Sequence, residues 1–561
     1  MFGGTVRLIH RIAVWAGAGI FAAGLCWPMM AAAQTAATRA DAEKDPVLKA
    51  MLTEMDRSMT QLQLPGFAKP FFIQYRIEDV EDFQATAEFG AGEGGQRVRQ
   101  RIARVVVRVG DYKTDSSTER GDGSLELAGL DDDPIAIRSA LWAATDAAYK
   151  NALAAYAQKQ AALKQVETPP QADDFSHEKP LISLAEPASL KVDEAAWQER
   201  VARESGIYRT NAAVKEIESN VEYSRATFEA RTITTRLVSS EGTIVRKAAG
   251  EYQEAFAVGT QADDGMRLDR SYSSTGTSLQ NMDSPQDFEK HAVALIESLA
   301  DLRKAPLVEE EYHGPLLMSS DAGADTLHAL LAGAVTAMRP RLGTEARTNG
   351  AFASSYHARV LPDFLDVVDD PGLKSYGGVG LLGAYDADDE GVAAQPVKLI
   401  TDGRLEDYLI GREPVKDFAQ SNGHGRAGIR GSARPMIGVL KITAKNGLTD
   451  EELNRKLMDM AKDSGLKSVY FVQTMAGDTP RLIYRVNADG TRQLLRGAKL
   501  EEIDYRALRS SIEAAGKDLF AANYFGDVPQ TVLAPALLFD DATIKRANEK
   551  NDKLPFYPPP E

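Results

Sequence analysis

Four short stretches of this 561-residue chain hold side chains that could do chemistry, and the first of them is acidic. The run Asp386-Ala387-Asp388-Asp389-Glu390-Gly391 offers carboxylate oxygens and ends on a turn-forming glycine. An EF-hand calcium loop would need a bidentate Glu at its twelfth position, which here is Val397. The run therefore predicts an acidic turn and gives little support to a calcium site.

Histidines mark the other stretches. His424 lies in the glycine-flanked loop Ser421–Ala427, and such polar loops often line sites, although an ordinary surface loop has the same composition. Ser354-Ser355-Tyr356-His357 places a serine near a histidine but lacks the G-x-S-x-G turn of a nucleophilic serine. A serine hydrolase is therefore not expected, and His424 stays open between a site residue and a loop residue.

The fourth stretch is a predicted amphipathic helix around His328. Its apolar residues recur at helical spacing, which indicates a side that packs inward: Leu327, Leu330, Leu331, Ala334, Val335 and Met338. His328 lies beside this stripe. A partly buried histidine with a polar partner explains that position better than a lone metal ligand does.

The residues from 361 to 403 predict short strands joined by turns. Asp370-Pro371-Gly372 has turn chemistry, and Asp402-Gly403 between two apolar runs predicts a tight hairpin. In order and spacing this region resembles the TldD/PmbA family, whose members are described as zinc metalloproteases and as modulators of DNA gyrase. The resemblance rests on the D-D-E-G-x-x-x-Q segment from Asp388 to Gln395, the I-x-x-G-x-L segment from Ile400 to Leu405, Gly314-Pro315-Leu316-Leu317 and Ser421–Ala427; it runs more weakly from about Asp45 to about Pro535.

The resemblance implies a zinc site that this chain does not preserve. Active members carry His-Glu-x-x-x-His on a helix after the Gly-Pro strand, and the matching positions here are His328, Ala329 and Gly333. A later family cysteine falls near Ala521, and the chain has no cysteine after Cys26. Zinc hydrolysis needs several ligands and a base for the bound water. We therefore predict no catalytic residue, no metal and no cofactor, with His328 as a vestigial position.

The possible substrate cleft comprises four residues, and the resemblance places the acidic turn beside it. They are His328, Asp386, Asp389 and His424. A rival hypothesis, an active metallopeptidase with relocated ligands, would use zinc bound by other side chains. Its ligands would come from His313, His328, His357, His424 and the acidic residues.

The N-terminus predicts a signal peptide over residues 1–33. Arg7 and Arg11 precede an apolar core, and Ala31-Ala32-Ala33 supplies small residues for cleavage before Gln34. Lipidation at Cys26 and an uncleaved anchor are weaker alternatives. We expect a secreted, periplasmic protein with no membrane association after cleavage.

The charge of the chain argues against nucleic acid as a partner. The formal net charge is −16, and removal of residues 1–33 takes away two arginines and no acid, leaving −18. Such a surface repels polyanions. The one basic cluster, Arg97, Arg99, Arg101, Arg104 and Arg108, follows a strand pattern and is interpreted as a solvated strand face.

The predicted fold class is α+β. A mixed helix and strand domain at 34–305 would precede a strand-rich, mostly antiparallel domain at 306–561, both TldD/PmbA-like. Helices are expected near 45–64, 133–165, 194–205, 284–303 and 449–464, and strands at 71–77, 83–89, 97–109, 221–258 and 468–472, with a loop at 90–95.

The resemblance implies that family members pair, one subunit with the metal and a related one without it. The chain is therefore interpreted as an exported pseudoenzyme, the zinc-less subunit or homologue in a metallopeptidase complex that acts in proteolysis of unstructured peptides. Its partner would be a metal-bearing TldD-like homologue in a hetero-dimer, or a second copy of itself, with an extended peptide as substrate. A stand-alone peptide-binding protein is the remaining alternative.

Overall fold

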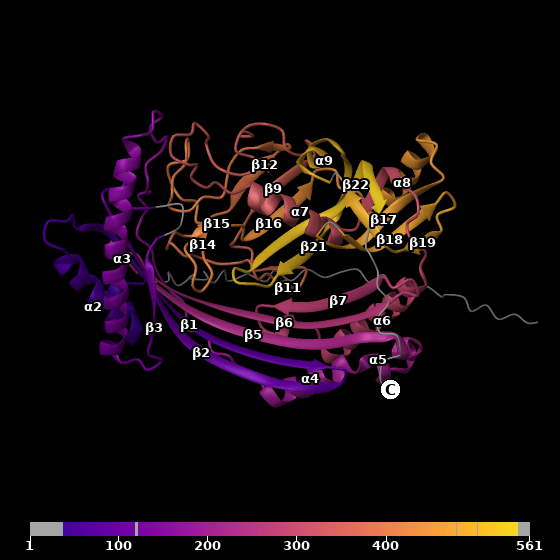
Figure 1. The fold of residues 1–561 in the computed structure, drawn as a ribbon, viewed down its shortest axis with the longest axis horizontal. Helices are drawn as coiled ribbons and strands as arrows, with labels where there is room; N and C mark the ends of the chain where they lie inside the picture. The colour runs from indigo at the N-terminus through magenta and orange to yellow at the C-terminus, as the bar shows by residue number, and fades with distance from the viewer. Residues whose placement is uncertain (1–36, 118–121, 478, 502, 548–561) are drawn as a thin grey trace, which may run out of the picture. The chain divides into compact units, whose positions relative to one another are not determined.

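Two β-sheets organise the computed structural model, which describes residues 37–117, 122–477, 479–501 and 503–547 (Figure 1). The first sheet is antiparallel except where β4 joins β6, and its order is β3-β2-β1-β5-β6-β4, with β7 also paired to β6. Its strands are β1 (Pro70–Glu88), β2 (Ala91–Val109), β3 (Ser124–Ala128), β4 (Ile182–Leu184), β5 (Val221–Ser239), β6 (Ile244–Gln261) and β7 (Arg267–Gly276).

The hairpin of β1 and β2 differs from the sequence prediction. The expected break in β1 and the expected loop at 90–95 are wrong, because each strand is a continuous run of 19 residues. The turn is confined to Phe89 and Gly90, whose φ angles are 51° and 83°. The glycines that suggested a loop instead pair with β1, where the hydrogen bonds of the ladder hold them in the strand.

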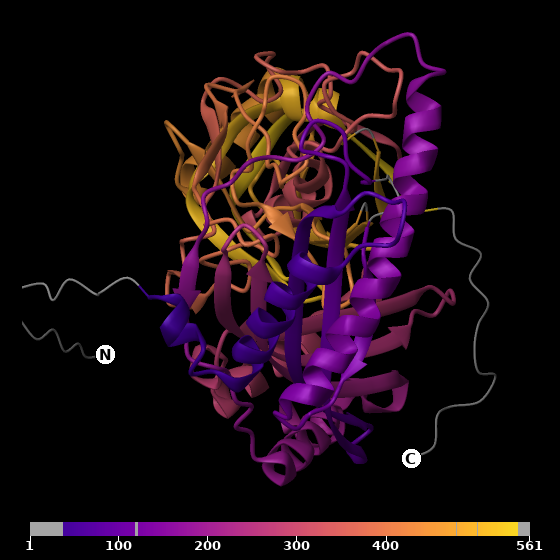
Figure 2. The same ribbon diagram turned by 90° about the vertical axis from the view of Figure 1, so that its left-hand side faces the viewer.

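Helices cover one face of this sheet. At one end, α2 and α3 pack on the odd-numbered residues Ile73, Tyr75 and Ile77 of β1, and at the other end α4 and α6 pack around Phe83 (Figures 1 and 2). This face therefore holds the N-terminal core. The helices are α1 (Arg39–Ala42), α2 (Pro46–Gln61), α3 (Pro134–Leu163), α4 (Glu194–Ser205), α5 (Ile207–Thr210) and α6 (Pro285–Lys304), with 3₁₀ turns η1 (Ala212–Asn220) and η2 (Leu279–Asn281).

The opposite face of the sheet is polar. Because side chains alternate along a strand, Gln74, Arg76 and Glu78 of β1 all lie on this second face. They meet loops of the C-terminal half: the Gln74 side chain donates to the carbonyl of Asp389 at 3.1 Å. The N-terminal sheet thus carries an apolar core on one face and a charged contact surface on the other.

The second sheet has eleven strands, with the path β13-β12-β9-β16-β22-β8-β17-β18-β19 and with β20 and β21 on β22. It is mostly antiparallel, with parallel pairs at β16–β22 and β8–β17. Its strands are β8 (Tyr312–Met318), β9 (Leu365–Asp369), β12 (Val397–Thr401), β13 (Arg404–Leu405), β16 (Val439–Ala444), β17 (Ser468–Ala476), β18 (Thr479–Asn487), β19 (Arg492–Leu495), β20 (Ala498–Glu501), β21 (Ile512–Tyr524) and β22 (Gln530–Arg546).

Helices pack on both faces of this second sheet. Helix α7 (Ser320–Ala334) shares a cluster with Leu316 and Met318, whereas α8 (Asp450–Asp463) packs against Leu317, which points to the other face. The remaining elements are α9 (Tyr505–Ser510) and the short pairs β10 (Ser375–Tyr376) with β11 (Val379–Gly380) and β14 (Gly425–Arg426) with β15 (Arg434–Pro435). The predicted α+β class is confirmed.

Local signals placed several elements correctly. The Thr449–Glu452 capping box begins α8, and the turn at Asp402 and Gly403 has φ angles of 51° and 70°, as a tight hairpin requires. The apolar stripe of α7 is correct up to Val335. Its last predicted member is wrong, because the helix ends at Ala334 and Met338 is 43% exposed.

The structure does not test two of the sequence predictions, the signal peptide and the domain boundary. The predicted signal peptide, residues 1–33, falls outside the described residues, and the domain boundary at residues 305 and 306 stays a prediction. Within the described part of the chain, no helix combines the length and apolar character needed to cross a bilayer.

Candidate functional site

On α7, His328 is followed by alanine at position 329 and glycine at position 333, whose side chains offer no donor atom. His328 stacks on Tyr524 with ring centroids 3.8 Å apart, and its Nε2 lies 2.7 Å from the side-chain oxygen of Gln530. The Tyr524 hydroxyl in turn donates to Asp325 at 2.8 Å. His328 is therefore a partly buried histidine with polar and aromatic partners, as its position beside the apolar stripe predicts.

The positions around His328 do not fit a zinc ion. Ala329 and Gly333 are exposed on α7 and offer no donor atom. Ala521 packs into a cluster with Leu533 on the far side of β21, and its neighbour Ala522 is the residue that packs with the α7 cluster. Among the described residues, no group of three His, Cys, Asp or Glu side chains could hold a metal ion. The donor set that zinc prefers is missing from this helix and its surroundings.

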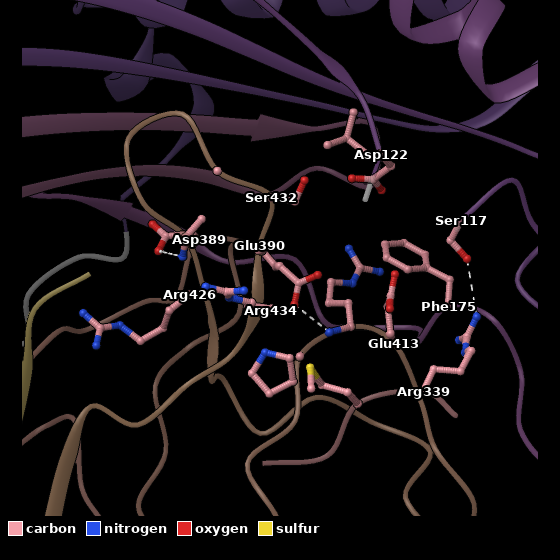
Figure 3. Close-up of a pocket in the computed structure, with 18 of the residues that line it drawn as sticks. Ser117, Asp122, Phe175, Arg339, Asp389, Glu390, Glu413, Arg426, Ser432 and Arg434 are labelled. Atoms are coloured by element: carbon pink, nitrogen blue, oxygen red, sulfur yellow. Dashed lines mark hydrogen bonds between the residues drawn. The ribbon is translucent and has the colours of Figure 1, made fainter. Parts of the chain in front are cut away.

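A cavity of about 840 Å³ opens between the charged face of the N-terminal sheet and loops of the C-terminal half. Figure 3 shows that its labelled side chains come from both halves, with Asp122 and Phe175 from one and Arg426 and Arg434 from the other. Its chemistry is dominated by guanidinium groups. These are Arg76, Arg104 and Arg108 from β1 and β2, and Arg412, Arg426 and Arg434 from later loops, with Arg339 and Arg341 at the rim that follows α7.

The acidic turn holds the walls of this cavity together. Asp388 accepts hydrogen bonds from the backbone N–H groups of Val392 and Gly425, at 2.8 and 2.9 Å. Glu390 accepts from the backbone N–H of Arg412 at 2.6 Å. A Cβ on Gly425 would lie 2.0 Å from the Glu390 carboxylate, so only glycine fits there.

Burial sets the ionisation of this turn. It raises the pKa of Asp388 to about 6 and, together with the Asp388 charge, raises that of Glu390 to about 8. Burial acts in the same direction on Asp389, but Lys247 and Arg76 outweigh it and lower the pKa of that carboxyl. Asp389 therefore favours its ionised form, and Lys247 donates to it at 2.7 Å.

The predicted cleft residues separate into two groups. Asp389 lines the large cavity and also a second one of about 360 Å³, and Asp386 lines only the second, where it pairs with Lys374. His328 and His424 line neither cavity. His424 is fully buried, with Nε2 3.1 Å from Asp369, and ties its loop to the end of β9.

The histidines proposed as relocated ligands do not gather. His313 contacts Glu311 and Thr543, and His357 contacts Glu406. Each of these exposed side chains thus has its own local partner.

The arginine cluster on β2 was the signal for the cavity, and its interpretation as a solvated face is wrong for three of its members. Arg101, Arg104 and Arg108 are 6, 8 and 4% exposed. Arg101 pairs with Asp79 on the helix-covered face, whereas Arg104 and Arg108 line the cavity. The alternation of residues along β2 separates its two faces in the sequence. Whether each face is buried depends on the segments that cover it, which the alternation does not reveal.

The second cavity brings together two carboxyl groups that the sequence did not single out. Glu78 and Glu251 are each 4% exposed, and in each the Oε2 atom has no hydrogen-bond partner among the described residues. Burial raises the pKa of both to about 7, although Arg76 beside Glu78 and Arg231 beside Glu251 oppose it. Buried carboxyl groups without full partners favour their neutral form.

Comparisons with known proteins agree on the architecture. Residues 311–546 match the family model of the PmbA/TldA metallopeptidase C-terminal domain. The fold is similar to that of TldE from Thermococcus kodakarensis, with 13% identity and a TM-score of 0.56 over 88% of this chain and 99% of that one. No curated protein matches the chain.

Two further structures have the same fold. A protein from Thermotoga maritima, described as a candidate modulator of a DNA gyrase, has 13% identity and a TM-score of 0.55 over 84% of this chain and 96% of its own. A protein from Bacteroides thetaiotaomicron with a similar description has 10% identity and a TM-score of 0.55 over 91% and 99%. Residues 311–546 therefore belong to the PmbA/TldA metallopeptidase C-terminal domain family, and the fold of these solved structures extends over most of the chain.

The raised pKa of Glu251 predicts that its contribution to stability changes with pH. A carboxyl with a folded pKa of about 7, against an ordinary value of 4.5, binds protons more tightly when folded. The loss of folding stability caused by ionising Glu251 is therefore absent below about pH 4.5 and grows until about pH 7. We expect Glu251→Gln to raise the free energy of unfolding at pH 8 by up to about 3 kcal/mol, and to leave it nearly unchanged at pH 4.5.

Chemical denaturation at the two pH values measures this difference. Glu126→Gln, on the exposed face of β3, is the control and should have little effect at either pH. An equal effect of Glu251→Gln at pH 4.5 and pH 8 would contradict the assignment.

Proposed function

We propose that this chain is an exported, non-catalytic member of the TldD/PmbA family that pairs with a metal-bearing homologue and helps to bind extended peptides for proteolysis. The observation that carries the proposal is which side chains α7 has at the positions that match the family's metal motif. The helix packs in the core, but its positions 329 and 333 are alanine and glycine, and His328 is engaged by Tyr524 and Gln530.

The cavity supports a binding role. It is bounded by side chains of both halves, and its volume lies within the range of small-molecule and peptide pockets. The chain leaves α7 at Val335 and forms part of the cavity rim from Ala337 to Leu342. The segment that follows α7 therefore contributes to a cavity that supports a binding role for this chain.

The first prediction of this proposal concerns metal. We expect the purified mature chain to contain no stoichiometric zinc and to have no peptidase activity, because Ala329 and Gly333 cannot ligate an ion or act as a base. Elemental analysis of the wild type, His328→Ala and His357→Ala tests this. About one zinc per chain, lost in His328→Ala and kept in His357→Ala, would refute the proposal.

The second prediction concerns assembly. We expect the mature chain to form a hetero-dimer with a homologue from the same genome that has an intact His-Glu-x-x-x-His, and to increase its activity on unstructured peptides. Light scattering and peptide cleavage assays of the two chains, separately and mixed, measure both effects. A chain that stays monomeric when mixed, and leaves the activity unchanged, would instead indicate a stand-alone protein.

The third prediction concerns export. The Arg7 and Arg11 region, the apolar core and Ala31-Ala32-Ala33 lead us to expect a mature protein that begins at or near Gln34 in the periplasm. N-terminal sequencing of protein from the native cell envelope tests it. Retention of residue 1 or lipid on Cys26 would be inconsistent with simple cleavage.

A further inference from the structure

The walls of the large cavity contain two pairs of arginines, and the two members of each pair lie directly opposite each other on neighbouring strands. Arg76 on β1 is the cross-strand partner of Arg104 on β2, and Arg426 on β14 is the partner of Arg434 on β15. All four line the cavity. Like charges at directly opposed positions destabilise a sheet. Such a repulsion in two separate walls of one cavity is compensated if an anion lies between them.

Three buried arginines of the cavity lining, two from the sheet and one from a later loop, lack part of the partner set that their burial requires. The side chains of Arg76, Arg108 and Arg412 are 3, 4 and 2% exposed, and each has a buried Nε–H with no acceptor among the described residues. Buried donors in folded proteins are nearly always satisfied. Because these Nε atoms are buried and not open to the cavity, they mark incompletely balanced positive charge in its wall, which an anion inside the cavity would offset.

The rest of each buried guanidinium is firmly held, so the donors are fixed before any ligand arrives. Arg76 donates to the carbonyls of Gly428 and Gly431, at 3.1 and 2.9 Å, in the loop between β14 and β15. Arg412 pairs with Glu241 at 2.6 Å. Arg108 and Arg412 both lie over the ring of Phe175, at 4.2 and 3.9 Å from its centroid.

The later loops add guanidinium groups that lack a carboxylate partner. Among the described residues, none of Arg341, Arg426 and Arg434 has a carboxylate within 4.0 Å, although Arg426 does stack on Tyr385 and donate to two backbone carbonyls. Arg434 is exposed at the cavity wall (Figure 3). These groups can approach an anion without first breaking an ion pair.

Most of the cavity's own carboxylates are already occupied. Asp122 and Glu413 face Arg108 at 3.0 and 3.5 Å, and Asp389 accepts from Lys247. Glu390 accepts from the backbone of Arg412 and is favoured in its neutral form. The fifth, Asp527, is exposed beside Gly428. The charge of Arg108 is therefore neutralised within the protein, whereas among the described residues no carboxylate lies within 4.0 Å of Arg341, Arg426 or Arg434.

We propose that this cavity binds a carboxylate of an extended peptide, so that the chain selects acidic peptides; the peptide nature of the ligand rests on the proposed function above. A planar guanidinium matches a carboxylate with two parallel hydrogen bonds, and the Nε–H is one of the donors used in that geometry. The site gives this acidic protein a local preference for acidic ligands that its net charge of −16 would not predict.

The test is fluorescence anisotropy with three labelled ten-residue peptides of Gly, Ser and Ala. One has a central Glu and an amidated C-terminus, the second has Gln in its place, and the third has Gln with a free C-terminal carboxylate. We expect the mature chain to bind the Glu peptide at least about tenfold more tightly than the amidated Gln peptide, as a buried charge-assisted pair implies. The third peptide reveals whether a C-terminal carboxylate serves as well.

Arg434→Gln is the variant and Arg430→Gln its matched control, since Arg430 is exposed four residues earlier and does not line the cavity. We expect Arg434→Gln to reduce the preference for Glu at least about fivefold, and Arg430→Gln to leave it unchanged. Thermal unfolding of each protein verifies that it is folded. The same melts, with and without inorganic phosphate, report binding of a simple anion.

The outcomes separate the two proposals. Equal binding of the Glu and Gln peptides, unaffected by Arg434→Gln, overturns the acidic selectivity and leaves peptide binding standing. If no peptide binds, but phosphate raises the melting temperature of the wild type and not of Arg434→Gln, the anion site stands and the peptide function fails. No peptide binding and no Arg434-dependent effect of phosphate overturns the anion site itself.

Discussion

The burial of charge on one face of the N-terminal sheet is the constraint on which the rest of the structure depends. Arg76, Arg104 and Lys247 all lie on a surface that the C-terminal loops cover. Charged groups removed from water need partners, and here the partners are Asp389, Ser432 and backbone carbonyls of the loop between β14 and β15. The sheet therefore dictates where those loops lie. The cavity remains where the loops leave guanidinium groups incompletely paired.

The acidic turn at residues 388–390 connects separate loops of this structure through hydrogen bonds. Asp388 and Glu390 accept hydrogen bonds from the backbones of Val392, Gly425 and Arg412, and glycine at position 425 leaves room for the Glu390 carboxylate. These contacts join two loops of the C-terminal half, and Asp389 joins them to the N-terminal sheet through Lys247. The acidic turn therefore has a structural role that does not depend on α7.

The one histidine of α7 has local partners. Tyr524 covers His328, and Gln530 satisfies its ring nitrogen, so the histidine keeps partners without a metal. The apolar side of the helix, with Leu327 and Leu331 fully buried, holds it in the core of the C-terminal sheet whatever its other face carries. Packing and ligation are therefore independent properties of this helix.

The sequence by itself determined the elements whose signals are local. The Asp402-Gly403 hairpin, the capping box at Thr449 and the apolar stripe of α7 up to Val335 depend on neighbouring residues, and the structure has all three. The family resemblance likewise rested on contiguous motifs. The tertiary structure alone decided that Arg104 and Arg108 are buried, that His424 lies inside the protein, and that Glu78 and Glu251 share a cavity. These properties arise from segments hundreds of positions apart, such as β1 and the Asp389 turn, and the free energy of a buried charge depends on what covers it.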